Sequence, residues 1–281
     1  MILSFVRLLL MSATFVCLSS SLVNAQYFYK DIMSNSKLNR EFAILKQGNI
    51  RSVKITSFDE NDKPSEGFFC QKKINKNFSQ SEMMSQSDIT GQSLLVTDYN
   101  TNGKAIKTVV TTPTTTNTVE FQYDDQGNLS LINTKTVADG DSEGISETHQ
   151  YVYENNKLVK MIRKKNNVLV STITFLSDGQ GNIIEEDPSG NSSDVKYYYY
   201  YDEKNRLTDV VHFNIVAKRL LPDYMFEYDT NSQARQMISI DESGRNYFIW
   251  KYAYDDKALP EIQKCYSKEK RLLGTIQYDY K

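Results

Sequence analysis

The chain has 281 residues, and 33 Lys and Arg stand against 35 Asp and Glu, which gives a formal net charge of −2. A nearly neutral chain offers no electrostatic reason to expect binding to nucleic acid or to an anionic membrane surface. The 19 Tyr and 13 Phe, set against a single Trp, favour half-buried pleated strands.

Residues 1–25 differ in composition from everything that follows. Arg7 is their only charge, an apolar run fills positions 8–18, and Ala25 precedes Gln26 at a position suited to cleavage. This pattern predicts a secretory signal peptide cut between Ala25 and Gln26. An uncleaved anchor and lipidation at Cys17 are the alternatives. No later stretch is apolar enough to cross a membrane, so we expect an exported protein located in the periplasm, on the outer cell surface or in the medium.

Two cysteines, Cys70 and Cys265, remain after removal of residues 1–25. An exported protein can oxidise such a pair to a disulfide. The two positions lie near opposite ends of the chain, and nothing in the sequence brings them together. Two separate buried thiols are therefore the favoured interpretation, with a disulfide as the alternative.

Residues 26–49 predict a short strand followed by one helix. The aromatic run at 27–29 can pair as a strand, and Ser36 can cap a helix that ends at Gly48. Leu38, Phe42 and Leu45 fall on one face of that helix. We expect it to cover one end or one edge of the following sheet.

From residue 50 onwards the chain predicts strand after strand, and the clearest hairpin lies at 119–129. Residues 119–123 alternate between apolar and polar, as a strand with one buried face does. Asp124 can accept backbone N–H bonds within the turn, and Gly127 supplies a residue with positive φ. Leu129 then begins the returning strand.

The same pattern recurs at intervals of 24 to 30 residues. The residue just before each turn is placed at Tyr99, Tyr123, Tyr153, Ser177, Tyr201, Tyr228, Tyr254 and Tyr278. A second series of turn-like segments lies between these positions, so the chain should run up and down as an antiparallel meander. We expect an all-β fold of about seven to eight hairpin repeats, roughly 14 to 18 strands, that form a twisted, curled sheet with one short N-terminal helix. Residues 50–281 would make one β-repeat domain.

The recurring units at 95–281 resemble degenerate YD repeats, the tyrosine–aspartate hairpins of the RHS family. The resemblance rests on Phe121–Leu129, on Tyr199–Leu207 and on Phe226–Asp229. It implies hairpins that spiral into a β shell, although this chain has too few of them to close such a shell. The chain looks more like the small exported YD-like proteins of the Bacteroidetes type. The resemblance implies no activity, no catalytic residue and no cofactor.

No familiar catalytic motif occurs in the sequence, which holds only two histidines, His149 and His212. Each lies on a predicted strand and is interpreted as a packing or surface residue. The acidic loop with Asp139, Asp141 and Glu143 is the nearest approach to a metal site. Its spacing resembles an EF-hand loop, but position 12 is a glutamine and no helices flank it. A solvated hairpin end is the favoured interpretation, so no metal and no cofactor are predicted.

The segment 197–201 is five consecutive tyrosines, which must face both sides of their strand. If some are exposed, Tyr197, Tyr199 and Tyr201 are candidates for contact with protein or sugar. Cross-strand packing of these rings on neighbouring Tyr and Phe is the favoured interpretation. The sequence therefore favours a non-enzymatic exported protein that offers a binding or structural surface to a protein or cell-envelope component. The alternatives are a carbohydrate-binding or carbohydrate-active protein with paired carboxylates, and an immunity-like partner of an exported toxin.

Overall fold

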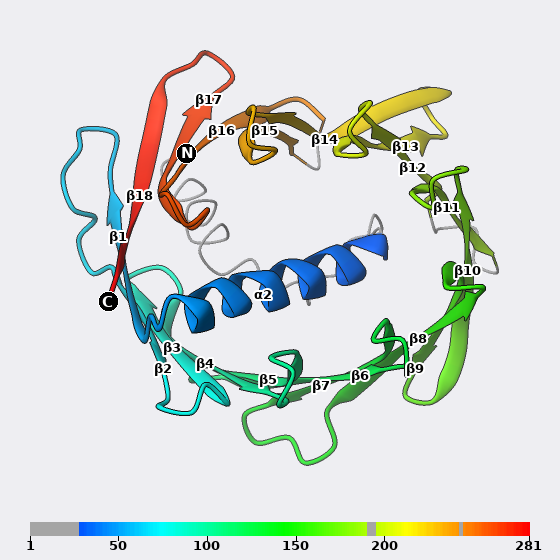
Figure 1. Ribbon diagram of the computed structural model, residues 1–281, viewed down its shortest axis with the longest axis horizontal. Coiled ribbons are helices and arrows are strands. Elements are labelled where there is room, and N and C mark those ends of the chain that lie inside the picture. The colour runs from blue at the N-terminus through cyan, green and yellow to red at the C-terminus, as the bar shows by residue number, and fades with distance from the viewer. Residues whose placement is uncertain (1–27, 190–194, 242–243) are drawn as a thin grey trace.

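The computed structural model describes residues 28–189, 195–241 and 244–281, and they form a closed antiparallel barrel with one helix inside it (Figure 1). Each strand pairs with its neighbours in the sequence, and the ring is completed where the last strand meets the first. Among the described residues, no helix is both long enough and apolar enough to span a membrane.

The helix α2 spans Tyr29–Gln47 and precedes all of the strands. The eighteen strands are β1 (Ser52–Phe58), β2 (Phe69–Ile74), β3 (Gln80–Ser87), β4 (Gly91–Tyr99), β5 (Ala105–Thr111), β6 (Thr115–Tyr123), β7 (Leu129–Ala138), β8 (Ile145–Glu154), β9 (Lys157–Lys165), β10 (Val168–Ser177), β11 (Ile183–Ser189), β12 (Tyr197–Tyr201), β13 (Leu207–Asn214), β14 (Arg219–Tyr228), β15 (Ala234–Ile240), β16 (Tyr247–Tyr254), β17 (Pro260–Ser267) and β18 (Leu272–Tyr280).

The barrel closes through a ladder between β1 and β18 that runs from the pair Val53–Tyr280 to the pair Phe58–Thr275. Beyond the ladder, the backbone N–H groups of Arg51 and Ser52 both donate to the carbonyl oxygen of Lys281, at 2.7 and 2.8 Å. The expectation of an open, curled sheet is therefore wrong. Closure pairs the backbone N–H and C=O groups that two free edges would have left unpaired. No local sequence pattern indicates that the sheet closes.

Closure also overturns the resemblance to YD repeats of the RHS family. That resemblance implied a chain of hairpins that spirals without returning to its start. Here β18 returns to β1, and the eighteen strands make one ring. The description of the chain as an RHS-like hairpin-repeat protein is therefore wrong, and the regular spacing of the tyrosines instead marks every second strand of a barrel.

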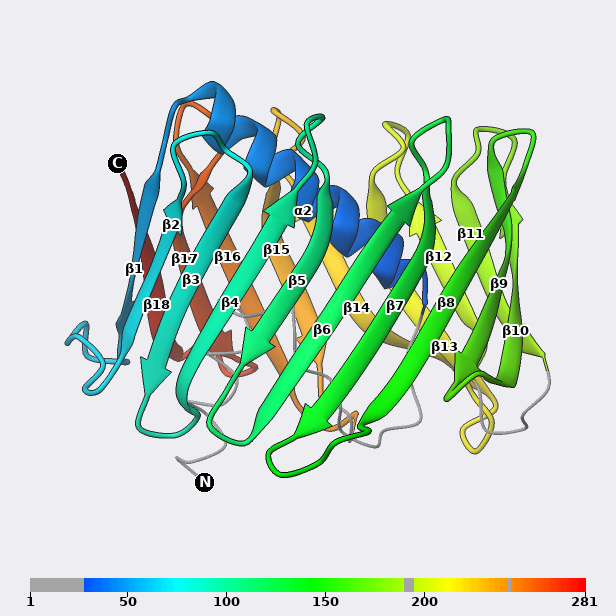
Figure 2. The ribbon, with the colours of Figure 1, turned by 90° about the horizontal axis from the view of Figure 1, so that it is seen from below.

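Helix α2 lies inside the barrel and crosses it obliquely (Figures 1 and 2). Its C-terminus lies at one end of the barrel, which we call the helix end. The helix starts earlier than expected, because Phe28 is its N-cap and Tyr29 is already helical. The predictions of a strand at 27–29 and of a cap at Ser36 are therefore wrong, while Tyr27 lies outside the described residues. The predicted end is right, since the N–H of Gly48 donates to the carbonyl of Ile44 at 2.9 Å.

The helix separates two hydrophobic clusters inside the barrel. Its C-terminal half contributes Leu38, Phe42 and Leu45, all buried as the sequence predicted, to a cluster with β1–β5. The ring of Phe42 stacks on Tyr99 with 3.5 Å between centroids. Its N-terminal end contributes Phe28 to a second cluster with strands from β7 to β13. Trp250 belongs to a third, smaller cluster on β16–β18.

The turns at the helix end of the barrel share one construction, apart from the two-residue β8–β9 turn at Asn155 and Asn156. An Asp or Asn follows the last strand residue, and its side-chain oxygen accepts a backbone N–H four residues on, at 2.7 Å for Asp124. The fourth turn residue has positive φ, for example 84° at Gly127. Ser232 and Ala258 adopt the same conformation at 63° and 65° although their side chains disfavour it. The turn geometry therefore prevails over residue preference at these two places.

The tyrosines before these turns form a ladder around the inside of the barrel. Six of their hydroxyls donate to the carbonyl oxygen of the first residue of the preceding strand, whereas the Tyr99 hydroxyl lies 3.3 Å from the Ser81 Oγ. The six bonds are Tyr123 to Ala105, Tyr153 to Leu129, Tyr201 to Ile183, Tyr228 to Leu207, Tyr254 to Ala234 and Tyr280 to Pro260, at 2.6 to 3.1 Å. The last member is Tyr280, two residues beyond the expected Tyr278. We call this set the tyrosine ladder.

Candidate functional site

The N-terminus of α2 is held by a buried carboxylate from the barrel wall. Glu186 on β11 is 1% exposed. Its Oε1 accepts the N–H of Phe28 at 2.8 Å, and its Oε2 accepts the N–H of Tyr29 at 2.9 Å and the hydroxyl of Tyr199 at 2.8 Å. Burial raises the pKa of Glu186 to about 7, against the effect of these three donors. The residue supplies the cap that the helix lacks in its own sequence.

A second group of charges surrounds the first turn of the helix. His149 on β8 lies between two carboxylates: its Nδ1 is 2.7 Å from Asp31 of the helix, and its Nε2 is 2.7 Å from Glu147. Arg163 on β9 donates to the same Glu147 at 2.8 Å, and Tyr151 donates to Asp31 at 2.9 Å. The group joins the helix to two strands, and with Glu186 we call it the helix lock.

The electrostatics of the helix lock favour an imidazolium between two carboxylates. Burial disfavours the charged ring of His149, but its hydrogen bonds to Asp31 and Glu147 outweigh burial and raise its pKa to about 9. Burial likewise opposes ionisation of Glu147, while His149 and Arg163 lower its pKa to about 2. The positive ring and the guanidinium therefore offset two negative carboxylates in a place with little water.

This arrangement is suited to holding the helix rather than to catalysis. A histidine that acts as a general base needs one ring nitrogen directed at a nucleophile or substrate. Both nitrogens of His149 contact carboxylates, and its side chain is buried. The sequence interpretation of His149 as a packing residue missed its charge pairing, because Asp31 lies 118 positions away. The nearby Glu147 was the only local signal.

The second histidine also pairs with a carboxylate inside the barrel. Nδ1 of His212 on β13 is 2.8 Å from Asp223 on β14. Burial raises the pKa of Asp223 against the influence of His212. Asp223 lies at a register irregularity of the β13–β14 ladder, which opposes Val211 to Pro222 and Val210 to Tyr224. The bulge turns this carboxylate towards the histidine.

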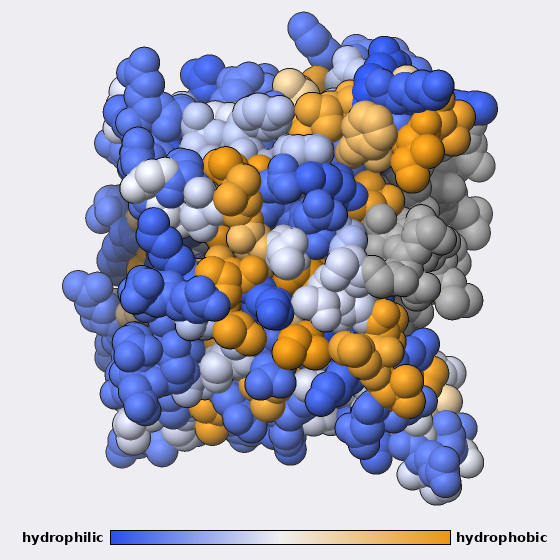
Figure 3. All heavy atoms as spheres, turned by 90° about the vertical axis from the view of Figure 1, so that its right-hand side faces the viewer, coloured by the Kyte–Doolittle hydropathy of each residue, from blue (hydrophilic) through white to orange (hydrophobic). Residues whose placement is uncertain are grey.

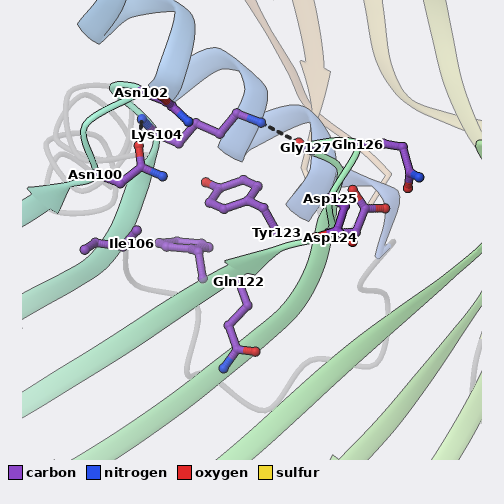
Figure 4. Close-up of a pocket in the computed structure, with 11 residues that line it drawn as sticks. Asn100, Asn102, Lys104, Ile106, Gln122, Tyr123, Asp124, Asp125, Gln126 and Gly127 are labelled. Atoms are coloured by element: carbon purple, nitrogen blue, oxygen red, sulfur yellow. Dashed lines mark hydrogen bonds between the residues drawn. The ribbon is translucent and has the colours of Figure 1, made fainter.

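A groove of about 590 Å³ lies at the helix end of the barrel, between the β4–β5 and β6–β7 turns (Figure 4). Lys104 crosses it, donates to the carbonyl of Gly127 and places its Nζ 4.8 Å from the centroid of the Tyr123 ring. Behind the groove, Asn35 and Asn39 of the helix donate to the Tyr123 hydroxyl at 2.9 and 3.3 Å. These bonds tie the helix to the tyrosine ladder, and Lys104 lines the groove.

The structure places the three candidate binding tyrosines inside the barrel. Tyr197 and Tyr199 are 1% and 2% exposed, and Tyr201 is a member of the tyrosine ladder. Tyr197 and Tyr199 are therefore buried, and none of the three rings is available as an exposed contact surface, because their face of β12 packs against the N-terminal end of the helix and its cluster. Tyr198 and Tyr200 are the rings of this strand that face outwards.

The remaining candidate residues do not come together. Cys70 and Cys265 are both buried free thiols, and burial raises their pKa values to about 11 and about 12. Asp139, Asp141 and Glu143 lie in the β7–β8 turn, where Asp141 accepts the N–H of Glu143 at 3.0 Å. In the described part of the chain, no three His, Cys, Asp or Glu side chains are arranged to hold a metal ion. Ala25 and Gln26 lie outside the described residues.

The outer surface carries an apolar belt that sequence reasoning did not find. Cross-strand pairing aligns outward residues of β12–β17 in one row: Tyr200, Asp209, Met225, Ile238, Ile249 and Tyr266. A neighbouring row on β10–β14 contains Leu176, Glu185, Tyr198, Val211 and Pro222. Figure 3 views the side of the barrel around β10–β12, where apolar side chains lie among hydrophilic ones. We call the two rows the apolar belt.

The comparisons with known proteins show only distant structural likeness. No family model and no curated protein matches the chain. A porin-like protein from Bacteroides uniformis ATCC 8492 is similar with a TM-score of 0.39 and 9% identity over 83% of this chain and 96% of its own. A porin-like protein from Bacteroides vulgatus ATCC 8482 is similar with a TM-score of 0.35 and 13% identity, over 71% of this chain and 97% of its own. TcdB2-TccC3 without its hypervariable C-terminal region is similar with a TM-score of 0.22 and 9% identity, over 76% of this chain and 16% of its own.

Proposed function

We propose that the chain is an exported, non-enzymatic barrel protein that offers a binding surface to a protein or another component of the cell envelope. The observation that carries this proposal is the apolar belt. Tyr200 and Met225 within it are 48% and 40% exposed. Large apolar side chains that adjoin one another on an outer surface are typical of interaction sites.

The interior supports a structural role for the helix. Glu186 caps α2, and His149 and Asp31 pair with each other at 2.7 Å. These ionisable groups contact other groups of the protein, so they hold the helix against the barrel wall. The outer surface is where this proposal places binding.

Export rests on residues 1–25 and is tested separately. Expression in a Gram-negative host should give a mature protein that begins at Gln26 in the periplasmic or outer fraction. Mass spectrometry of the purified protein measures its N-terminus. A full-length chain in the cytoplasm would contradict this part of the proposal.

The binding surface is tested by capture of partners from envelope extracts of the source organism. The wild-type protein should recover a stoichiometric partner, and Met225→Glu, which places a charge in the middle of the apolar belt, should lose it. Thr118→Glu is the matched control, because Thr118 lies on the outer face of β6, outside the belt. Recovery of no partner by the wild type, or of the same partner by Met225→Glu, would count against the proposal.

A further inference from the structure

Two hairpins project large apolar side chains at the end of the barrel opposite helix α2. In the β9–β10 hairpin, Val168 is 67% exposed and Leu169 is 60% exposed. In the β13–β14 hairpin, Ile215 is 70% exposed and Val216 is 94% exposed. Large apolar side chains that are grouped and exposed in this way are typical of an interaction site.

Basic residues flank both apolar tips. Lys165 ends β9 next to its tip, and Lys218 and Arg219 follow Val216 after one alanine; all three are exposed. The neighbouring β7–β8 turn is acidic, with Asp139, Asp141 and Glu143. Basic side chains at this end therefore border both tips; a second basic group, Lys268, Lys270 and Arg271, lies in the β17–β18 turn at the same end. The net charge of −2 conceals this distribution.

The two tips can reach one flat surface together. Both lie at the end of the strands away from the tyrosine ladder, as Figure 2 shows for the lower end of the barrel. Four strand spacings separate the β9–β10 hairpin from the β13–β14 hairpin, which corresponds to about 20 Å along the rim. The outward pair Phe213 and Leu220 continues the apolar surface from the second tip towards the apolar belt.

We propose that these two tips dock the barrel on an anionic lipid bilayer. Val168, Leu169, Ile215 and Val216 enter the boundary between headgroups and acyl chains, and Lys165, Lys218 and Arg219 pair with lipid phosphates. The acidic β7–β8 turn is repelled by the same surface, so the barrel docks with that turn tilted away from the lipid. This inference rests on the proposed function and names a membrane surface as the envelope component.

A bilayer fits these tips better than a protein does. The tips are convex and separated, and a protein partner would need two matching pockets about 20 Å apart. A fluid lipid surface accepts protruding apolar side chains without such complementarity, and its negative charge complements the basic residues.

The test is co-sedimentation of the exported protein with phosphatidylcholine vesicles that contain or lack phosphatidylglycerol. The wild type should bind the vesicles with phosphatidylglycerol more tightly. The quadruple variant Val168→Ser, Leu169→Ser, Ile215→Ser and Val216→Ser should bind at least about tenfold more weakly. All variants share one N-terminus, so differences between them report the tips alone.

A charge variant and a control complete the experiment. The charge variant combines Lys165→Gln, Lys218→Gln and Arg219→Gln. Its affinity for vesicles with phosphatidylglycerol should fall about fivefold per substituted residue, and its affinity for pure phosphatidylcholine should change little. Ile106→Ser should bind as the wild type does, because Ile106 is also exposed but lies at the helix end of the barrel. Circular dichroism and thermal unfolding establish that each variant is folded.

Three outcomes would overturn the inference. The wild type could fail to bind either kind of vesicle, the serine variant could bind as tightly as the wild type, or the tips could prove to capture a protein from envelope extracts in the absence of lipid binding. The proposed function fails differently, through Met225→Glu in the capture experiment, so the two failures can be told apart.

Discussion

The carboxylate of Glu186 accepts the backbone N–H of Phe28 at 2.8 Å, although 158 residues separate the two in the chain. Helix α2 is thus capped by the eleventh strand of the barrel rather than by its own flanking residues. An end of a helix that is buried without partners costs several backbone hydrogen bonds. The helix and the barrel should therefore unfold together.

Replacing the cap should destabilise the whole protein. Glu186→Ala leaves the N–H groups of Phe28 and Tyr29 and the hydroxyl of Tyr199 without their acceptor, and should cost about 3 kcal/mol of unfolding free energy. Glu186→Gln retains one acceptor oxygen and should cost less. Urea unfolding measures both. Glu185→Ala is the control, since Glu185 pairs with Lys196 on the outer surface and should change stability by less than about 1 kcal/mol. Equal effects at 185 and 186 would contradict the role of the cap.

The stability of the barrel should fall as the solution becomes alkaline. The folded pKa of His149 is raised from 6.5 to about 9, so its contribution is fully present below pH 6.5 and is lost as pH rises through about 9. The pKa of Glu186 is raised from 4.5 to about 7, so its protonated form also contributes stability. That contribution is lost as pH rises through about 7, which again lowers stability towards alkaline pH. Urea midpoints of the wild type and of His149→Gln, compared across this range, should converge at high pH. A constant difference between them would show that His149 does not carry the effect.

Each rung of the tyrosine ladder should contribute modestly to stability. Tyr228→Phe removes only the hydroxyl that donates to the carbonyl of Leu207 at 2.7 Å, and should cost about 1 kcal/mol. Tyr200→Phe is the matched control because Tyr200 lies on the outer face and is 48% exposed. Thermal unfolding compares the two. If both variants melted as the wild type does, the ladder would be a consequence of packing with no energetic weight.

Closure of the barrel can be tested with a covalent bond. Lys54 and Asp279 face each other across the β1–β18 ladder, and Cα atoms of such pairs lie about 5.5 Å apart, within reach of a disulfide. Lys54→Cys with Asp279→Cys should oxidise within one chain and migrate faster on a non-reducing gel. Lys54→Cys with Glu120→Cys should not, because β6 is far round the ring. Absence of the first bond under oxidising conditions would favour an open sheet.

The strands were largely predictable from the sequence because their signals are local. The alternation before Tyr123, the acceptor at Asp124 and the positive φ at Gly127 are settled within one hairpin, and Tyr123 pairs with Leu129 as expected. Closure was not predictable, since the pairing of Val53 with Tyr280 depends on the accumulated twist of every strand between them. The early start of α2 was missed for a related reason: its cap comes from Glu186.

The helix lock could be predicted even less well. Glu147 and His149 are two positions apart, so they lie on the same face of β8 and can contact each other. The contact with Asp31 depends on where the helix lies within the closed barrel. The burial of Tyr197 and Tyr199 could not be predicted because five tyrosines in succession carry no alternation from which to infer the buried face.

The tyrosine ladder links each strand that ends at a tyrosine to the strand before it, so the wall is assembled from pairs of strands. A barrel of this kind can gain or lose a pair by duplication or deletion of roughly 24 to 30 residues and still present every tyrosine to a carbonyl. Loss of a single strand would reverse the direction of all later ones and direct their tyrosines to the wrong end. The circumference should therefore change in even steps over evolutionary time, and with it the length of helix needed to cross the ring.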